Sequence, residues 1–147
     1  LKIKIRELAK ENRIPVIMVT GNGSDVVIDI ERFDKEPNLP LMSGYLKRQV
    51  IDDIKSLSAS QAGRATIFSE KIKLARDFMG VEYLDSRLVK SFSLVSSKLA
   101  GIPQIAESSF LRGASIAYFV RQIAQGNKVN SGRYNLKLSD VQRSKKN

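Results

Sequence analysis

The spacing of apolar residues changes along the chain, and each spacing predicts a different element. Residues 1–13 (LKIKIRELAKENR) carry apolar side chains three and four positions apart, which predicts a helix. Pro15 cannot continue that helix, and it pushes Ile14 toward an extended conformation. We expect the buried stripe of the helix to consist of Leu1, Ile5, Leu8 and Asn12.

Two strands are predicted after this helix. Residues 15–20 (PVIMVT) are apolar on both faces, which is typical of a central, covered strand of a parallel sheet. Residues 21–25 (GNGSD) are of the types that favour a tight turn of the backbone. Residues 25–31 (DVVIDIE) then alternate, so we expect an antiparallel strand near the sheet edge, with Asp29 and Glu31 on its solvated face.

The rest of the chain is mainly helical in pattern. Residues 34–44 contain two prolines and a glycine and predict an irregular link. The helices are expected at 45–57, at 67–80, from a cap at Asp85 or Ser86 to Gly101, and at 104–126. The last helix is rich in Ala, Ser and Gly, so a neighbour can pack close to it. Residues 131–140 predict a final strand.

These elements predict one domain of the α/β class with a mixed sheet. Residues 1–40 form its helix, strand and hairpin, and residues 41–100 form a largely helical insertion. Residues 101–142 hold the Gly/Ala-rich helix and the last strand, and residues 143–147 form a basic tail. Leu1 is an unusual first residue, which indicates a part of a longer polypeptide.

Composition narrows the possible chemistry. The chain has no Cys and no His, which excludes disulfides, thiolate or imidazole metal sites and His-dependent nucleophiles within it. Its net charge of +10 favours polyanionic partners, but the basic residues are spread out, so specific nucleic-acid binding is disfavoured. No apolar run reaches the ~18 residues of a membrane span, and the expected location is the cytoplasm.

Three groups of polar residues are candidates for a site. GNGSD is followed by a strand and not by a helix, which favours a hairpin over a phosphate cradle, although it can border a nucleotide held elsewhere. Asp29, Glu31 and Asp34 can bind magnesium or act as acid and base, but a solvated face with Arg32 paired to one acid is the preferred interpretation. Arg112 beside Gly113 can present a guanidinium to an anion.

Several phrases together resemble a known family. RIPVIMVT, DIERFDKEP, LRGASIAYFVRQIAQG and SGRYNLKL occur in an order that is similar to the ThiF/MoeB/HesA superfamily of adenylating enzymes, related to ubiquitin-activating enzymes. The resemblance covers residues 1–40 and 101–141 and implies the C-terminal part of a Rossmann-like ThiF-type domain. RIPVIMVT and DIERFDKEP are most similar to a bacterial branch of ThiF-like proteins.

The resemblance also implies an activity and a site. The family uses ATP and magnesium to activate a carboxylate, here expected to be the C-terminus of a small carrier protein, as an acyl-adenylate. Lys2 matches a basic family position, and Thr20, Gly21, Asn22 and Gly23 would lie beside the adenylate. The family's glycine-rich ATP turn would precede Leu1. This chain alone is therefore expected to be inactive and to hold no metal. Because the family commonly pairs through this half of the domain, the resemblance also implies a homodimer.

Two other functions remain open from the sequence. The helical insertion and the Gly/Ala-rich helix can form a non-catalytic dimerisation or interaction module, independent of nucleotide. Alternatively the basic charge marks a nucleic-acid-binding domain, whose affinity would fall steeply with salt.

Overall fold

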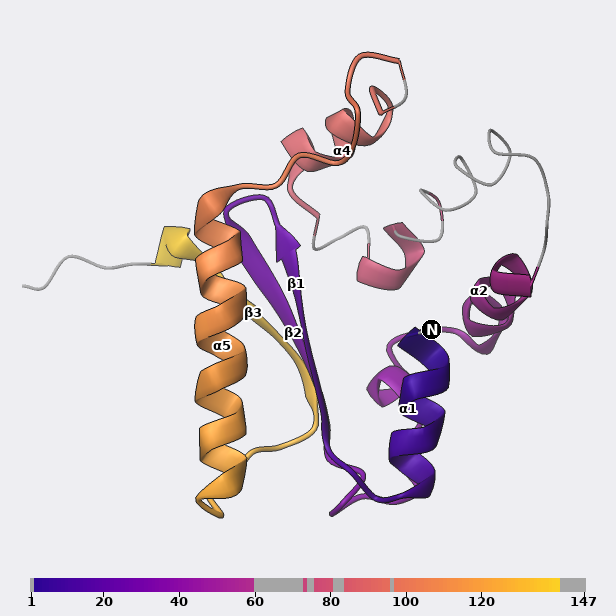
Figure 1. Ribbon diagram of the computed structural model, residues 1–147, viewed down its shortest axis with the longest axis vertical. Helices are drawn as coiled ribbons and strands as arrows, with labels where there is room; N and C mark the ends of the chain where they lie inside the picture. The colour runs from indigo at the N-terminus through magenta and orange to yellow at the C-terminus, as the bar shows by residue number, and fades with distance from the viewer. Residues whose placement is uncertain (1, 60–72, 74–75, 81–83, 96, 141–147) are drawn as a thin grey trace, which may run out of the picture.

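The computed structural model describes residues 2–59, 73, 76–80, 84–95 and 97–140 (Figure 1). These residues form a mixed α/β structure with one open antiparallel sheet of three strands. In chain order the elements are α1 (Lys2–Glu11), β1 (Val16–Asn22), β2 (Asp25–Glu31), η1 (Leu41–Gly44), α2 (Arg48–Ala59), α4 (Ser86–Phe92), α5 (Ala106–Ala124), β3 (Gly132–Leu136) and η3 (Leu138–Asp140).

The β1–β2 hairpin confirms the reversal predicted at residues 21–25. Asn22 pairs with Asp25, so Gly23 and Ser24 form the turn between the strands. Gly23 has a φ of 63°, a left-handed value that suits a short hairpin turn and that glycine adopts without strain.

The order of the strands differs from the prediction. The sheet order is β1-β2-β3 with antiparallel pairs throughout, so β2 is central and β1 lies at an edge of the described sheet. Every β2 residue after Asp25 is buried, whereas most of β1 is only half-buried. Within the described sheet the predicted central position of β1 is therefore wrong, because its apolar run was taken as a sign of two covered faces. No strand in the described ranges pairs with β1 in parallel.

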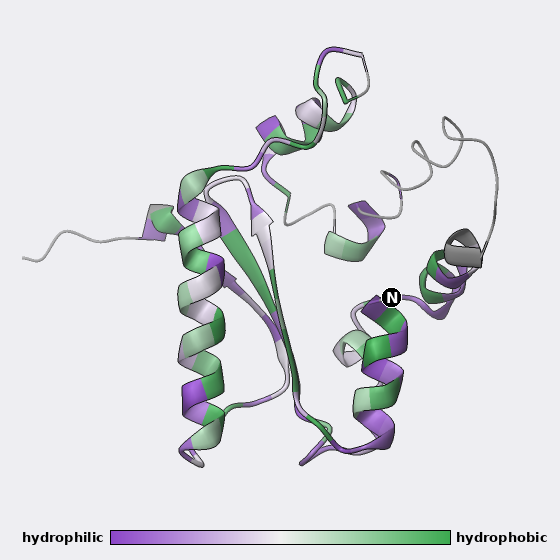
Figure 2. Cartoon of the chain, viewed as in Figure 1, coloured by the Kyte–Doolittle hydropathy of each residue, from purple (hydrophilic) through white to green (hydrophobic). Residues whose placement is uncertain are grey.

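The apolar face of β2 packs against α5. Val26, Ile28 and Ile30 are at most 3% exposed, and Leu111 and Phe119 of α5 lie against them. Figure 2 shows the apolar colouring along β2. Burying each such side chain stabilises the fold by about 1.5–3 kcal/mol before the entropy of ordering is subtracted.

The opposite face of the sheet is covered by α1 and η1. The buried residues of α1 are Ile3, Arg6 and Ala9, whereas Ile5 and Leu8 are about half exposed. The predicted stripe of Ile5, Leu8 and Asn12 is therefore wrong, and Leu1 lies outside the described residues. The helix is turned so that Arg6 points inward, because Arg6 forms an ion pair with Glu31 of the sheet.

The helical regions follow the sequence pattern with shorter bounds. Asp85 caps α4 by accepting hydrogen bonds from the N–H groups of Arg87 and Leu88. α4 ends at Phe92 and not near Gly101, because serine hydroxyls there donate to nearby backbone carbonyls and compete with the helix. The helix expected at 67–80 falls mostly outside the described residues, and the tail 143–147 lies wholly outside them. Among the described helices, none is long and apolar enough to cross a membrane.

Residues 42–44 make an unusual turn after β2. Met42, Ser43 and Gly44 all have left-handed backbones, with φ values of 56°, 51° and 77°. The Met42 N–H donates to a carboxylate oxygen of Glu31, and the Ser43 hydroxyl donates to the Ile30 carbonyl. Both bonds go to β2, so the central strand holds a conformation that non-glycine residues seldom adopt.

Candidate functional site

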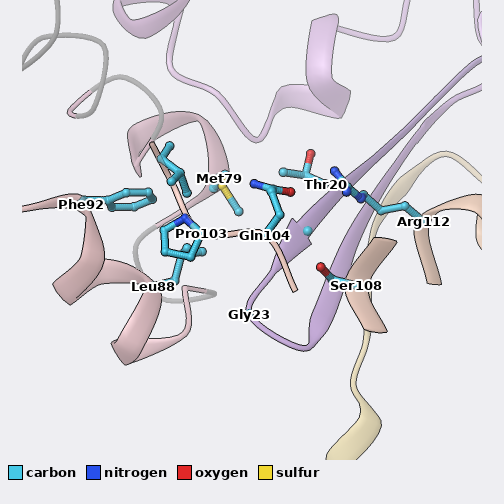
Figure 3. A pocket seen from close by; sticks show the side chains of 11 residues that line it. Thr20, Gly23, Met79, Leu88, Phe92, Pro103, Gln104, Ser108 and Arg112 are labelled. Carbon is cyan, nitrogen blue, oxygen red and sulfur yellow. The ribbon is translucent and has the colours of Figure 1, made fainter. Parts of the chain in front are cut away.

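A cavity of about 140 Å³ lies where the tip of the β1–β2 hairpin meets the beginning of α5 (Figure 3). The hairpin, the 79–92 region, the link before α5 and the first turns of α5 all contribute to its wall. The lining residues are Thr20, Gly21, Gly23, Met79, Leu88, Phe92, Ile102, Pro103, Gln104, Ser108 and Arg112.

Gly21 allows α5 to approach the hairpin closely. A Cβ atom at this position would lie 3.1 Å from the Ser108 Oγ and 3.8 Å from the Arg112 Nε. Ser108 is buried, and its hydroxyl donates to the Ile105 carbonyl in the preceding turn. The missing side chain at Gly21 therefore brings the polar first turns of α5 to the wall of the cavity.

Asn22 and Gly23 attach α4 to the hairpin tip. The Asp85 N–H donates to the Asn22 Oδ1 over 2.8 Å, immediately before α4 begins. A Cβ atom on Gly23 would lie 3.0 Å from the Asp85 Cβ. These contacts place Leu88 and Phe92 of α4 on the apolar side of the cavity, as Figure 3 shows.

Arg112 is the charged member of the described cavity lining. It is half-buried, and its Nη2 donates to the Ser109 hydroxyl over 2.9 Å. None of the ion pairs between described residues includes it. Thr20, Gln104 and Ser108 add neutral polar groups. A guanidinium with such neighbours suits a carboxylate or phosphate group.

The size of the cavity limits its ligand. Pockets that enclose a whole small molecule measure about 300–1,000 Å³, and this one is smaller. A cavity of this size suits a carboxylate with one or two small residues.

The structure separates the residues that the sequence singled out. Thr20, Gly21, Gly23 and Arg112 line one cavity. Asn22 acts through its bond to Asp85, as described above. The Lys2 ammonium instead lies 5.5 Å from the centre of the Phe78 ring and is outside this lining.

Asp29 forms a buried ion pair across the sheet. Its carboxylate lies 2.6 Å from the Nε of Arg133, the residue directly opposite on β3, and both side chains are 4% exposed. Arg133 also donates to the backbone carbonyls of Phe78 and Met79. The predicted solvated role of Asp29 is wrong, because this pair ties β3 and the 78–79 region to the central strand.

Glu31 is also buried, and its two oxygens have different partners. One oxygen lies 2.6 Å from the Arg6 Nε, and the other accepts the Met42 N–H over 2.6 Å. Burial raises the pKa of Glu31 above its usual value, and the nearby Arg6 guanidinium opposes that shift. Glu31 therefore joins α1 and η1 to the sheet and does not lie on a solvated face.

Arg32 was expected to pair with one of the acids of this region, and its partner in the structure is Asp34. Both carboxylate oxygens of Asp34 accept hydrogen bonds from the Arg32 guanidinium, over 2.8 and 2.6 Å. These bonds lower the pKa of Asp34. All the acids of the 29–34 region thus have arginine partners. Among the described residues, no three acidic side chains gather in a group that could bind a metal ion.

Sequence reasoning missed much of the cavity wall. Ser108 and Gln104 belong to it, as do Met79, Leu88 and Phe92 from the region between the hairpin and α5. The one available signal was the small-residue composition of α5, which indicated a close neighbour but did not identify it. Contacts between segments so far apart in sequence leave no local pattern.

Comparison with known proteins found a distant relative of the chain. The chain is 27% identical over 139 residues to the protein named "Uncharacterized protein MT1398" of Mycobacterium tuberculosis. That alignment covers 95% of this chain but 18% of the relative, so the chain spans less than a fifth of its length. No family model matches the chain, and no solved structure matches it.

Proposed function

We propose that this chain is the C-terminal part of a ThiF-like, Rossmann-like adenylyltransferase domain, and that its cavity binds the carboxylate end of the peptide to be activated. The observation that carries the proposal is the placement of Arg112 beside Gly21, in a cavity whose other described lining residues are uncharged. The length of the mycobacterial relative is consistent with a chain that is one part of a larger protein.

The cavity has the properties needed to present a carboxylate. The guanidinium of Arg112 attracts the carboxylate and fixes its plane through paired hydrogen bonds. The apolar wall formed by Met79, Leu88 and Phe92 keeps water away from the peptide residues that precede the bound carboxylate. Holding the nucleophile in a fixed geometry lowers the entropic part of the barrier to its attack on a phosphorus atom.

The described residues do not fit ATP or magnesium. The glycines of the hairpin lead into a strand, so no helix N-terminus faces a phosphate there. Asp29, Glu31 and Asp34 are each neutralised by an arginine. Under this proposal the triphosphate and its metal are held by other parts of a cytoplasmic enzyme, and this chain alone does not adenylate.

ATP–pyrophosphate exchange by the native polypeptide tests the proposal. The probe is a peptide that ends in Gly-Gly with a free carboxylate, and the same peptide as an amide is its control. We expect exchange with the free acid alone. Arg112→Ala should raise the KM for the peptide about 10- to 100-fold, since a charge-assisted bidentate contact is lost.

A matched variant separates this effect from a change of net charge. Arg48 is an exposed residue of α2 outside the cavity lining, and Arg48→Ala should leave the exchange unchanged. Two results would reject the proposed role of the cavity. One is an equal rate of exchange with the free-acid peptide and with its amide, and the other is an equal change of KM in Arg112→Ala and Arg48→Ala.

A further inference from the structure

A second cavity lies at the far end of α5, away from the hairpin tip. Its volume is about 420 Å³, within the range of about 300–1,000 Å³ that is usual for small-molecule pockets. One wall is the turn at residues 32–36, which follows β2, and the other is the end of α5 with the link at residues 126–130. In Figure 1, α5 begins beside the hairpin tip and ends at the opposite end of the sheet.

Three hydrogen bonds brace the two walls of the second cavity against each other. The backbone N–H of Arg32 donates to the Ser131 hydroxyl over 3.0 Å, and the Arg32 Nη1 donates to the Val129 carbonyl over 3.1 Å. The Ser131 hydroxyl in turn donates to a carboxylate oxygen of Glu36 over 2.6 Å. These bonds fix the spacing of the walls, so a ligand meets a preformed site and little of its binding energy is spent on ordering the chain.

The acids of this lining accept hydrogen bonds from protein donors, whereas its lysines have no counterion. Asp34 accepts two bonds from the Arg32 guanidinium, and Glu36 accepts one from a serine hydroxyl. Lys35 and Lys128 lie one on each wall and are exposed, and neither forms an ion pair with a described residue. The described lining carries three cations against two carboxylates, which leaves a net charge of +1.

A phosphate group matches this lining better than a carboxylate does. A phosphate monoester carries a charge of about −1.5 to −2 at pH 7 and offers three acceptor oxygens, so it can engage an ammonium group from each wall. The net charge of +10 on the whole chain also favours an anion. The rest of the lining includes Glu36 and the side-chain amides of Asn127 and Asn130, which suit the hydroxyl groups of a polyol.

We propose that the second cavity binds a small, soluble phosphate monoester of a sugar or polyol, with its phosphate between the ammonium groups of Lys35 and Lys128. The second cavity shares no lining residue with the cavity of Arg112. Binding of this ester is therefore independent of the proposed adenylyltransferase function.

Isothermal titration calorimetry of the native polypeptide is the first test, with ribose phosphorylated on its primary hydroxyl as the probe. We expect a Kd of about 1 mM or tighter, and no binding of unphosphorylated ribose. The double variant K35Q/K128Q should weaken the Kd at least ~10-fold, because two charge-assisted contacts are lost. Circular dichroism checks that this variant is folded.

A second double variant controls for net charge. K98Q/K137Q removes two exposed lysines outside the cavity lining, so its net charge equals that of K35Q/K128Q, and it should bind ribose phosphate as the wild type does. Three results overturn the proposal: no binding of ribose phosphate, equal binding of ribose, or equal Kd values in the two double variants.

Hydrogen exchange of the native polypeptide locates the bound ester. Ribose phosphate should slow the exchange of backbone amides at residues 32–36 and 126–131 and leave the hairpin tip unchanged. Protection of the hairpin tip without protection of these two segments would place the ester beside Arg112, and the proposed site would be wrong.

Pelleting with lipid vesicles distinguishes a soluble ester from a lipid head group. Phosphatidic acid carries the same phosphate monoester, so phosphatidylcholine vesicles that contain it are the probe. We expect that the wild type and K35Q/K128Q pellet with these vesicles to the same extent. Pelleting that K35Q/K128Q abolishes and K98Q/K137Q retains would overturn the assignment to a soluble ligand.

Discussion

At the scale of the residue, Gly21 and Gly23 of the hairpin are glycines for different physical reasons. Gly21 has no left-handed φ, and its absent side chain makes space for Ser108 and Arg112. Gly23 has a φ of 63° and also lies against Asp85. Gly126, after α5, has a similar φ of 75° but open space around it. A comparison of Gly23 with Gly126 therefore separates the cost of a left-handed backbone from the cost of the contact with Asp85.

Gly23→Ala should destabilise the protein more than Gly126→Ala. Both substitutions place a Cβ on a left-handed backbone, which costs about 1 kcal/mol. Gly23→Ala also pushes on Asp85 at 3.0 Å, so we expect about 1–2 kcal/mol in addition. Chemical denaturation of the two variants measures the difference in the free energy of unfolding.

The same pair of variants reports on α4. Because Asp85 caps α4 and is bonded to Asn22, Gly23→Ala should increase hydrogen exchange in α4, and Gly126→Ala should not. Equal unfolding free energies and equal exchange would mean that Asp85 moves aside freely and that the hairpin tip does not hold α4.

Individual residue types predicted the turns well and the buried charges poorly. The Gly-Asn-Gly-Ser-Asp stretch predicted the hairpin because tight reversals depend on local backbone preferences. A helix cap at Asp85 or Ser86 was predicted for the same reason, and the structure shows that the cap is Asp85. The burial of Asp29 was not predictable, because it depends on Arg133, which lies more than a hundred positions away. An alternating strand gives no sign of whether its polar face meets water or arginine.

At the scale of the element, the Arg6–Glu31 pair decides how α1 lies on the sheet. The pair is buried, and it is the reason that Ile5 and Leu8 face outward. Hydrophobic periodicity alone selected the other face of the helix, since it treats every arginine as a surface residue. The position of α1 in the chain was therefore predictable, whereas its rotation was not.

Arg6→Met should make stability strongly dependent on pH. Without Arg6, the buried Glu31 carboxylate has no counterion, and at pH 8 we expect a loss of about 3–5 kcal/mol. Burial raises the folded-state pKa of Glu31, so the folded protein binds the proton more tightly than the unfolded chain does. Stability of the variant should therefore be higher at pH 5 and fall as the pH rises through the raised pKa.

The double variant R6M/E31Q is the control for this effect. Its glutamine keeps an acceptor for the Met42 N–H but carries no charge. It should recover much of the lost stability at pH 8 and show little of the pH dependence. Thermal denaturation of both variants at pH 5 and pH 8 measures this, and a flat profile for Arg6→Met would show that water reaches Glu31.

At the scale of the whole molecule, the outer edge of β1 is the main open feature of the sheet. Its inner edge pairs with β2 along all seven residues, and no described strand pairs with the other edge. Unpaired edges are sites where further strands add to a sheet. Under the proposed function, a part of the adenylyltransferase domain outside this chain would cover this edge.

Hydrogen exchange of the β1 amides tests that arrangement. In the native polypeptide, the β1 N–H groups that do not donate to β2 should exchange at least ~100-fold more slowly than in the 147-residue chain alone. Slow exchange in β2 of both samples shows that the chain is folded in each. Equal exchange of the outward β1 amides would mean that no strand is added at this edge.

The turn at residues 42–44 sets an order of events during folding. Its backbone is unfavourable for Met42 and Ser43 by itself, and its supporting bonds come from the Ile30 carbonyl and the Glu31 carboxylate of β2. We therefore expect it to form only after the central strand is in place. Its contacts are late ones, so weakening them should speed unfolding and leave the rate of folding almost unchanged. On this expectation the turn contributes to the lifetime of the native state, and unfolding rates of variants at Ser43 measure that contribution.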